Sequence, residues 1–432
     1  MNNDFFELNN IVVSEDSSIE GDGWLEQESV IYGILKGRFY VGAYSKINET
    51  AKCLNCFIGR FSTIEDGVTL GYEERKISNF SVHSFARDTD FSASDEYYEK
   101  IKSRYYYEQG KYTFIGSDVL IGRNSTITEG CCISDGVIIE PNSFVNTNIP
   151  PYAIASGTPA VIVGYRFPEV YISKLLSSKW WMKDISSLTN VGKSNTIDYV
   201  NNFTLIDNVH NRKLPELTKK RIHINTVRKT FAVDESSRMI VGPSHVDLWF
   251  TKYNRRQTPI PKNSHLIPIP ALSSFSDQLH SLVKWWLEWF DDVILFVPDF
   301  RIGNVATDKK TKDGRYIRQD ITGDENSIKC YELGLESLDK LIKTGKVKLF
   351  FWCLFGREFL NKKEGKYINL DGEYDHPIWN YSKLKKIYKN AVIDMENNVD
   401  GFNNLSELIV DSSIHPTHEC YELIRKLFET VK

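Results

Sequence analysis

The sequence predicts a two-domain protein, with a coil of parallel β-strands in its first half and an α/β domain in its second half. Two observations support this prediction. An aliphatic side chain recurs at every sixth position between residues 115 and 145, and strand-like and helix-like runs alternate after residue 238. We expect an N-terminal segment over residues 1–29, the coil over 30–185, a helical linker over 186–235 and the α/β domain over 236–432.

The composition is that of a soluble globular protein. The chain has 432 residues, of which 41% are hydrophobic and 25% are charged, which is enough for two or three domains. The net charge of −4 does not favour nucleic acid or a membrane surface as a partner. No apolar run approaches the roughly 20 residues that span a bilayer. The acidic first 25 residues lack the pattern of a signal peptide.

The seven cysteines indicate reduced thiols and a cytoplasmic protein. Their number is odd, and their spacing shows no disulfide framework. Cys53 and Cys56 form a C-x-x-C pair, but no second pair accompanies them. We therefore expect these two side chains to pack in the core, and we predict no metal site.

The six-residue repeat is the strongest pattern in the chain. Its aliphatic positions are Ile115, Ile121, Ile127, Ile133, Ile139 and Val145. A slim residue follows four positions after each of the first five, namely Val119, Ser125, Cys131, Val137 and Ser143. An α-helix would need apolar spacings of three and four, and an amphipathic strand would need strict alternation. A triangular coil of parallel strands, with one hexad per side, explains the repeat.

Weaker hexads extend the coil toward the N-terminus and reveal a long interruption. They are centred on Val41, Ile47, Ile58, Ile64 and Leu70, so that about four coils fit between residues 30 and 150. The interruption covers residues 72–114 and holds His83, the one histidine in the first 200 residues. His83 is either a solvated loop residue or a general base, because imidazole has the unperturbed pKa nearest to neutral pH.

The second half reads as a parallel sheet covered by helices. We expect strands at 238–244, 264–270, 292–304, 346–355 and 405–410, and helices at 275–290, 330–345, 381–395 and 416–432. We expect a connector helix at 214–224. Polar stretches follow three strands, namely "GPSH", "DFRIGN" and "DSSIHPTH". In this architecture, sites form at the carboxyl ends of the strands.

The first half resembles the hexapeptide-repeat acyltransferases, and within them the xenobiotic (chloramphenicol and streptogramin) acetyltransferase branch. The hexads, the histidine-bearing insertion, "NIPPYAIASGTPAVIVGYRF" and "PEVYISKLLSSKWW" carry the resemblance over roughly residues 30–185. It implies a left-handed parallel β-helix, a homotrimer with active sites between neighbouring subunits, and acetyl-CoA as acyl donor. It also implies that His83 is the catalytic base.

The same resemblance implies a set of residues that contact coenzyme A. The set comprises Gly122, Arg123, Gly157, Thr158, Pro159 and Arg166. Val161 stands where the family usually has a lysine two residues after the proline, and Arg166 would then supply the phosphate contact.

The second half resembles the SGNH hydrolase superfamily, which includes polysaccharide O-acetyltransferases. The resemblance implies a three-layer, flavodoxin-like α/β domain. By position, Ser244 would be the nucleophile, Asn304 an oxyanion donor and His415 the base. Asp411 would orient the base, although it lies four residues before His415 where the family has three, and Pro243 replaces the usual acidic residue.

Together these patterns predict an acetyl-CoA-dependent O-acetyltransferase. The expected acceptor is a sugar hydroxyl of a bacterial surface polysaccharide such as capsule or O-antigen, because a second domain is appended to the coil. In one alternative, the C-terminal domain is the catalytic esterase or transferase that uses Ser244 and His415. In another, it is a non-catalytic carbohydrate-binding module that presents a polymer to His83.

Overall fold

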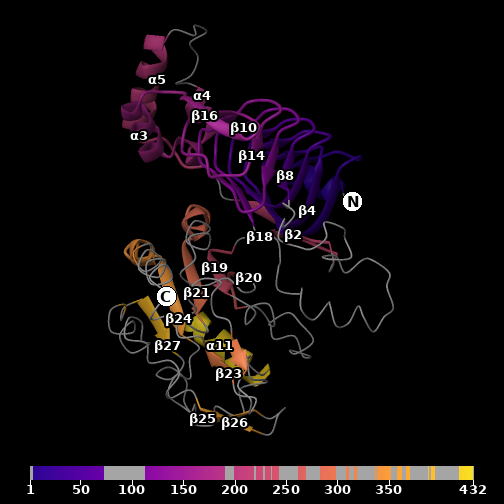
Figure 1. Cartoon of the computed structure of the whole chain (residues 1–432), viewed down its shortest axis with the longest axis vertical. Helices are drawn as coiled ribbons and strands as arrows, with labels where there is room; N and C mark the ends of the chain where they lie inside the picture. Colours follow the sequence, from indigo (N-terminus) through magenta and orange to yellow (C-terminus); the bar gives the residue numbers. More distant parts are fainter. Residues whose placement is uncertain are drawn as a thin grey trace. The chain divides into compact units, whose positions relative to one another are not determined.

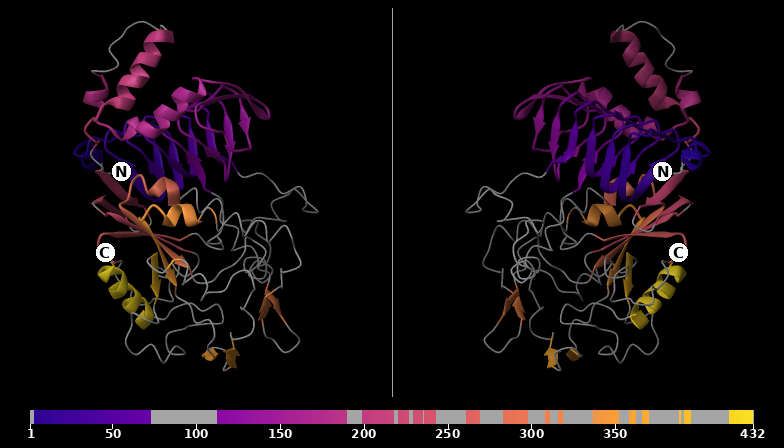
Figure 2. Two further views of the ribbon diagram at one scale, coloured as in Figure 1. Left: turned by 90° about the vertical axis from the view of Figure 1, so that its left-hand side faces the viewer. Right: turned by 90° about the vertical axis from the view of Figure 1, so that its right-hand side faces the viewer.

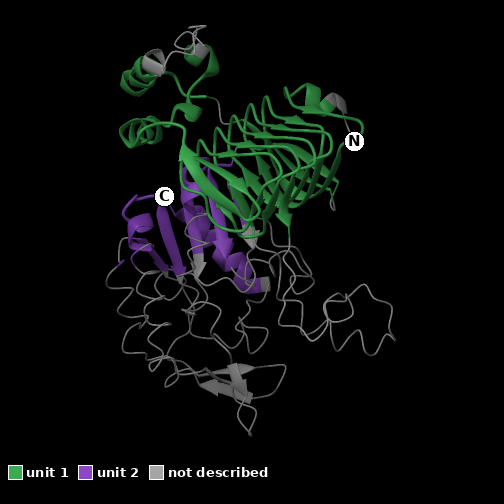
Figure 3. Ribbon diagram, turned by 45° about the horizontal axis from the view of Figure 1, so that its top comes forward, with its two compact units in different colours: residues 1–235 green, residues 236–432 purple. Residues whose placement is uncertain are grey.

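The computed structural model divides the chain into two compact units, residues 1–235 and residues 236–432 (Figure 3). The residues that the structure describes are 3–72, 112–189, 199–217, 220–226, 229–234, 236–242, 261–268, 283–297, 308–310, 316–318, 336, 338–351, 358–361, 366–369, 388, 391–394 and 418–431. Each unit is described by itself below.

Unit 1 is a parallel β-helix with three sides, as the hexads predict (Figure 1). Side 1 is an eight-stranded sheet of β1 (Val12–Val13), β3 (Val30–Ile31), β5 (Lys46–Ile47), β7 (Thr63–Ile64), β10 (Leu120–Ile121), β13 (Ile138–Ile139), β15 (Ala153–Gly157) and β16 (Ala160–Tyr165). Every pairing in it is parallel except that of β15 with β16.

Sides 2 and 3 belong to one sheet, because three long strands bend around the corner between them. These strands are β2 (Ser18–Glu26), β4 (Ile34–Val41) and β6 (Lys52–Ile58). Side 2 continues with β8 (Thr69–Tyr72), β11 (Thr126–Thr128) and β14 (Phe144–Val145), and side 3 with β9 (Thr113–Ile115) and β12 (Cys132–Ile133). Stacking coils in this way pairs the backbone groups of each rung with the next rung.

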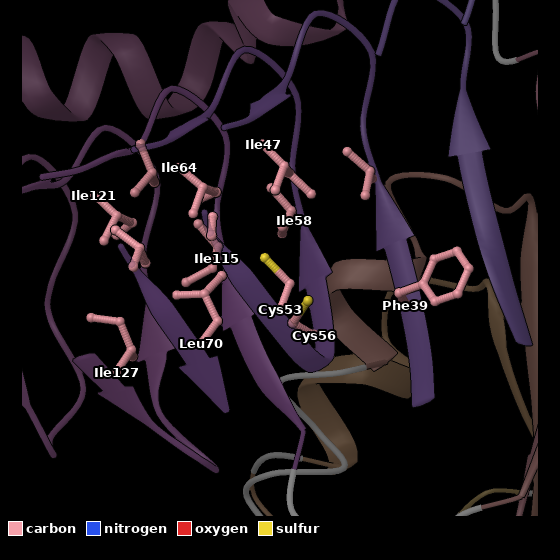
Figure 4. Packing of buried hydrophobic residues seen from close by; sticks show 14 of the residues in the cluster. Phe39, Ile47, Cys53, Cys56, Ile58, Ile64, Leu70, Ile115, Ile121 and Ile127 are labelled. Atoms are coloured by element: carbon pink, nitrogen blue, oxygen red, sulfur yellow. The ribbon is translucent and has the colours of Figure 1, made fainter. Parts of the chain in front are cut away.

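The core of unit 1 contains the side chains that the repeat singles out. All six aliphatic positions from Ile115 to Val145 are at most 1% exposed, and the five slim positions are at most 4% exposed. Ile47, Ile64 and Ile121 follow one another from rung to rung inside the coil (Figure 4). Cys53 and Cys56 are buried in the same cluster, as expected from their packing interpretation.

Three corners connect the sides, and two of them are named here by a residue. The Gly122 corner, at the side 2 end of the side 1 strands, comprises residues 14–17, 32–33, 48–51, 65–68, 122–125, 140–143 and 157–159. The Tyr44 corner, between sides 3 and 1, comprises residues 26–29, 42–45, 59–62, 116–119, 134–137 and 150–153. The Tyr44 corner has one residue with positive φ in every coil, and the Gly122 corner has such residues in its later coils, because the chain turns sharply there.

The long interruption leaves the coil between sides 2 and 3. β8 ends at Tyr72 and β9 begins at Thr113. β8 and β9 pair with successive parts of β6, and β11 and β12 pair with β8 and β9 in turn. The coil therefore resumes in register, and residues 73–111 lie outside the described residues.

Two expectations about the ends of unit 1 are wrong. The coil begins at β1 and β2, before residue 30, where α1 (Asn3–Glu7) precedes it. The segment 221–234 forms the hairpin of β17 (Arg221–Asn225) and β18 (Thr230–Asp234) in place of the end of a connector helix. β17 pairs with β2, because its alternating side chains fit the pleat of that edge strand. The helical part of the region comprises α3 (Glu169–Ser178), η2 (Trp180–Met182), α4 (Ile185–Thr189) and α5 (Tyr199–Asn211).

Unit 2 contains a five-stranded parallel sheet (Figure 2). In spatial order its strands are β20 (Ser264–Pro268), β19 (Arg238–Gly242), β21 (Asp292–Val297), β24 (Val347–Phe351) and β27 (Val392–Asp394). This is the order 2-1-3-4-5, one of the two common orders of doubly wound α/β sheets. α11 (His418–Thr430) packs Phe428 on Phe350 of β24. Two further hairpins are β22 (Asp308–Lys310) with β23 (Tyr316–Arg318), and β25 (Glu358–Asn361) with β26 (Lys366–Asn369).

The first four predicted strands of unit 2 are confirmed in their cores, but the helix predicted at 381–395 is wrong over its last residues, where a strand forms. β27 lies inside the range 381–395 that was expected to be helical. The predicted strand at 405–410 falls outside the described residues. Among the residues that the structure describes, no helix is long and apolar enough to cross a membrane.

Candidate functional site

Gly122 lies at a close approach of two coils at the Gly122 corner. Its N–H donates to the Ile139 carbonyl at 2.8 Å. A Cβ at position 122 would lie 2.7 Å from both the Ile139 oxygen and the Pro141 nitrogen. Both of these are backbone atoms of the next coil, which cannot move aside for a side chain. The stacking of the coils therefore requires glycine at position 122, whether or not a ligand binds there.

Arg123 is the exposed cation of this corner. Its backbone N–H donates to Glu65 Oε2 at 2.9 Å, whereas its guanidinium lies 3.6 Å from Asp66 with the side chain 67% exposed. An ion pair that open to solvent contributes little to stability. The guanidinium can therefore turn toward an incoming anion at small cost, and the fork geometry of arginine suits a phosphate.

Gly157, Thr158 and Pro159 form the turn between β15 and β16, and hydrogen bonds join this turn to the Gly122 corner. The Asn142 N–H donates to the Arg123 carbonyl at 2.8 Å, and Thr158 Oγ1 donates to the Asn142 carbonyl at 3.3 Å. Gly157 has φ +105° and a cis peptide bond joins Thr158 to Pro159. Five of the six predicted coenzyme A residues thus lie together at one corner.

Buried serines support this corner from inside the coil. Ser125 Oγ and Ser143 Oγ both donate to the Glu140 carbonyl, at 3.0 and 2.6 Å. Ser143 Oγ in turn accepts from the Gly157 N–H at 3.3 Å. The hexad pattern identified both serines as slim core residues, but not this hydrogen-bonded role, which depends on the stacking of neighbouring coils.

β16 places an apolar strip directly after this turn. Val161 and Val163 are each 61% exposed, and β16 is the last strand of the side 1 sheet. An edge strand has backbone groups available for hydrogen bonding, and its exposed valines offer an apolar surface. Such a strip can bind the uncharged portion of an extended ligand.

Arg166 is not brought to the Gly122 corner. Its Nη1 donates to Asp118 Oδ2 at 2.8 Å and to the Gly136 carbonyl at 2.7 Å, at the Tyr44 corner. Its guanidinium also lies 5.3 Å from the centre of the Tyr152 ring. Burial raises the pKa of the Asp118 carboxyl more than the neighbouring Arg166 lowers it. Arg166 is therefore occupied by internal partners.

The five predicted catalytic residues, His83, Ser244, Asn304, Asp411 and His415, lie outside the described residues. Their nearest described neighbours in sequence are strand and helix ends. The segment with His83 leaves the coil after β8, and Ser244 follows the last residue of β19 by two positions. Asn304 comes seven positions after β21, and His415 comes three positions before α11. No group of three or more potential metal ligands is found in the described part of the chain.

Comparison with known proteins shows local similarity to acetyltransferases. The chain is 48% identical over 69 residues to a probable macrolide acetyltransferase of Lysinibacillus sphaericus, which is 16% of this chain and 38% of that protein. It is 30% identical over 130 residues to a chloramphenicol acetyltransferase of Morganella morganii, which is 29% of this chain and 58% of that protein. The chain therefore spans between about a third and three fifths of the length of these curated relatives.

Among solved structures, the comparison finds a match to the polySia-specific acetyltransferase NeuO. It is 19% identical, covers 36% of this chain and 66% of its own chain, and superposes with a TM-score of 0.25. No protein-family model matches the chain.

Proposed function

We propose that the protein is an acetyl-CoA-dependent O-acetyltransferase that acetylates a sugar hydroxyl of a bacterial surface polysaccharide, with His83 as general base. The observation that carries the proposal is the hexad-built parallel β-helix, interrupted by the segment that holds His83. The local identity to acetyltransferases named in the comparisons supports the reaction class.

Acetyl-CoA is proposed to bind at the Gly122 corner. The Arg123 guanidinium would pair with a phosphate, and the turn at Thr158 and Pro159 would contact the nucleotide. The valines of β16 would pack against the apolar part of the pantetheine arm, while its amides hydrogen-bond to the strand edge. Arg166 is left out of this set because its hydrogen bonds are used within the protein.

The proposed reaction needs one base and one acyl donor. The His83 imidazole takes the proton of the acceptor hydroxyl while that oxygen attacks the thioester carbonyl. The tetrahedral intermediate collapses, the C–S bond breaks, and the coenzyme A thiolate leaves and is protonated. The products are an acetyl ester on the sugar and free coenzyme A.

The acceptor class is inferred from domain organisation. Unit 2 adds residues 236–432 to unit 1, an addition that acetyl transfer to a small acceptor would not need. A large polymeric acceptor gives a physical motive for a second unit. We also propose a homotrimer, because a coil with an exposed face can bury that face against copies of itself. Sedimentation equilibrium giving the monomer mass at micromolar concentration would exclude the trimer.

Free coenzyme A release from acetyl-CoA and purified surface polysaccharide tests the reaction. The His83→Ala variant is expected to lose at least about a hundredfold in kcat, which is the lower range for a general base. Arg123→Ala is expected to raise the KM for acetyl-CoA and leave kcat unchanged. If His83→Ala retains the wild-type rate, the base is elsewhere and the proposal fails.

A second candidate function places the chemistry in unit 2. The strand order 2-1-3-4-5 and the position of Ser244 two residues beyond β19 favour it, because sites of such sheets lie beyond the carboxyl ends of the strands. Ser244 would be the nucleophile, His415 its base and Asn304 an oxyanion donor, with Asp411 orienting His415. Hydrolysis of a chromogenic acetyl ester without coenzyme A, lost in Ser244→Ala, would support it. A Ser244→Ala variant that changes only the KM for the acceptor would instead indicate a carbohydrate-binding module.

A further inference from the structure

We propose that a row of aromatic rings at the Tyr44 corner binds a neutral glycan chain along the axis of the coil. The row comprises Tyr44, Phe61 and Trp180, and is named the aromatic row below. The inference rests on the proposed function, since it names where the polymeric acceptor is held. It can nevertheless be tested by binding alone, without acyl transfer.

Each of the three rings contacts the next one in the row. Tyr44 and Phe61 occupy the same corner position in successive coils, and their rings stack with centroids 5.0 Å apart and an interplanar angle of 16°. The Trp180 ring follows at 5.2 Å from Phe61. All three side chains are partly exposed, so the row presents ring surface to solvent.

The backbone at this row makes the aromatic residues unexpected. Tyr44 has φ +61° and Phe61 has φ +59°, in the left-handed region. The matching column at the Gly122 corner uses Gly67, Asn124 and Asn142, which are the residue types that tolerate this conformation. A bulky side chain there brings Cβ close to the following carbonyl oxygen. Bulky residues kept in such conformations concentrate at ligand-binding sites.

The aromatic row anchors the segment that contains η2 on the coil, but this role explains only part of the row. Trp180 Nε1 donates to the Tyr152 hydroxyl at 3.4 Å, and the Trp180 ring packs on Phe61, so both contacts hold η2 against the coil. Tyr44 lies one coil further from this anchor and stacks on Phe61. A glycine or asparagine at position 44 would satisfy the backbone better, and the anchor would keep Trp180 and Phe61.

The surroundings of Tyr44 favour a neutral polyhydroxyl ligand. Burial raises the pKa of the Tyr44 hydroxyl, and the carboxylates of Glu28 and Asp184 add to this effect. Carboxylates accept hydrogen bonds from sugar hydroxyls and repel anions such as coenzyme A or an acidic polymer. Tyr44 has one ring face that Phe61 does not cover, and the C–H face of a pyranose can lie on such a face, while the ring edges continue the apolar contact along the row. Adjacent coils lie about 4.8 Å apart, so a sugar chain can lie across successive rings.

Isothermal titration of the full chain with neutral glucan, mannan and galactan hexasaccharides, and with an acidic hyaluronan hexasaccharide, tests the aromatic row. We expect the wild-type protein to bind at least one neutral hexasaccharide. The Tyr44→Asn variant should bind it with a Kd at least about tenfold higher. Asparagine accepts the left-handed backbone, so the melting temperature should move by less than about 4 °C. Tyr44→Phe should bind within about threefold of wild type. Tyr32→Asn, a half-exposed tyrosine outside the row, is the matched control and should bind as wild type.

Several results would overturn the proposal. The first is that the wild-type protein binds no neutral hexasaccharide at about 10 mM. The second is that Tyr44→Asn binds with the wild-type Kd. The third is that the wild-type protein binds hyaluronan more tightly than the neutral hexasaccharides. Loss of oligomer mass in Tyr44→Asn would assign the row to a contact between copies of the chain instead. Glycan binding without coenzyme A release would support the row while refuting the proposed acetyl transfer.

Discussion

The buried ion pair between Arg60 and Glu26 should be a decisive element of unit 1 stability. Arg60 Nε and Nη2 donate to the two carboxylate oxygens of Glu26 at 2.7 and 2.8 Å, with the side chains 0% and 1% exposed. Glu26 Oε2 also accepts the Ala43 N–H at 2.8 Å, and Arg60 Nη1 lies 3.7 Å from Met182 Sδ. The pair and its neighbours thus join three successive coils to the segment after α3.

The expected magnitude follows from this burial. Arg60→Met leaves the Glu26 carboxylate without its partner in the interior, which costs about 3–5 kcal/mol. For a domain of this size, each kcal/mol lowers the melting temperature by roughly 2–4 °C, so a decrease of at least about 6 °C is expected. Glu26→Leu should cost at least as much, because the Ala43 N–H also loses its acceptor.

The double variant Glu26→Leu/Arg60→Met separates a coupled pair from two independent contacts. Replacing both charges by apolar groups removes the unpaired charge, so the loss should be less than the sum of the single losses by about 3 kcal/mol. Calorimetry of the full chain measures the shifts, and hydrogen exchange at the Ala43 amide reports the lost acceptor. Additive single effects, or a melting temperature within 2 °C of wild type in Arg60→Met, would refute the reasoning.

Three further predictions concern the candidate site and the two units. Gly122→Ala should weaken acetyl-CoA binding and destabilise unit 1 by more than about 1 kcal/mol, because the added Cβ would lie 2.7 Å from backbone atoms of the next coil. Equilibrium unfolding measures the loss of stability, and titration with coenzyme A measures the loss of affinity. Wild-type values in both measurements would contradict this prediction. Burial raises the Asp118 pKa above its ordinary 3.8, so ionising this carboxyl lowers the stability of the folded protein progressively as pH rises from 3.8 through the raised pKa. The stability of Asp118→Asn minus that of wild type should therefore increase with pH over this window. Urea titrations at several pH values measure this difference, and a constant difference would exclude the effect. Arg238→Ala should lower the stability of unit 2 by about 2 kcal/mol or more, since Arg238 donates to both oxygens of Asp292 at 2.7 Å and to two carbonyls at the end of α11. Hydrogen exchange should become faster in α11 and stay unchanged in the coil of unit 1. Equal effects on both units would contradict this prediction.

The hexad pattern predicted the coil because the repeat is local and its cause is local. Each Ile or Val of the series fills one side of a narrow core, and the structure buries all of them. The same pattern could not predict where the coil begins. The first coil lacks regular hexads, and its long strand β2 is completed by β17, about 200 residues later in the chain.

Misassigned elements share a different cause. The segment containing Arg221 and His223 was expected to be helical, yet it alternates polar and apolar residues and pairs with β2. His223 Nε2 lies 2.8 Å from Asp22 Oδ1, a contact that no local pattern contains. β27 likewise forms inside a helix-like run because a neighbouring strand, β24, is present to pair with it.

The candidate site divides in the same way. The motif around Gly157, Thr158 and Pro159 predicted a cluster with Gly122 and Arg123, and hydrogen bonds between coils join that cluster. Arg166 was grouped with them by sequence position, but the structure engages it with Asp118 at a different corner. The catalytic roles of His83 and Ser244 remain predictions.

By itself, the sequence determined the repeat, which side chains of the coil point into its core, and the place of the interruption. It also determined the general alternation of strands and helices in the second half. These properties depend on the period of side chains along a few neighbouring residues. The tertiary structure decided which residues meet across coils: Arg60 with Glu26, Arg166 with Asp118, and Tyr44 with Phe61. Such contacts arise only when a rung is stacked on the next, because stacking fixes backbone conformations and burial that no local pattern encodes.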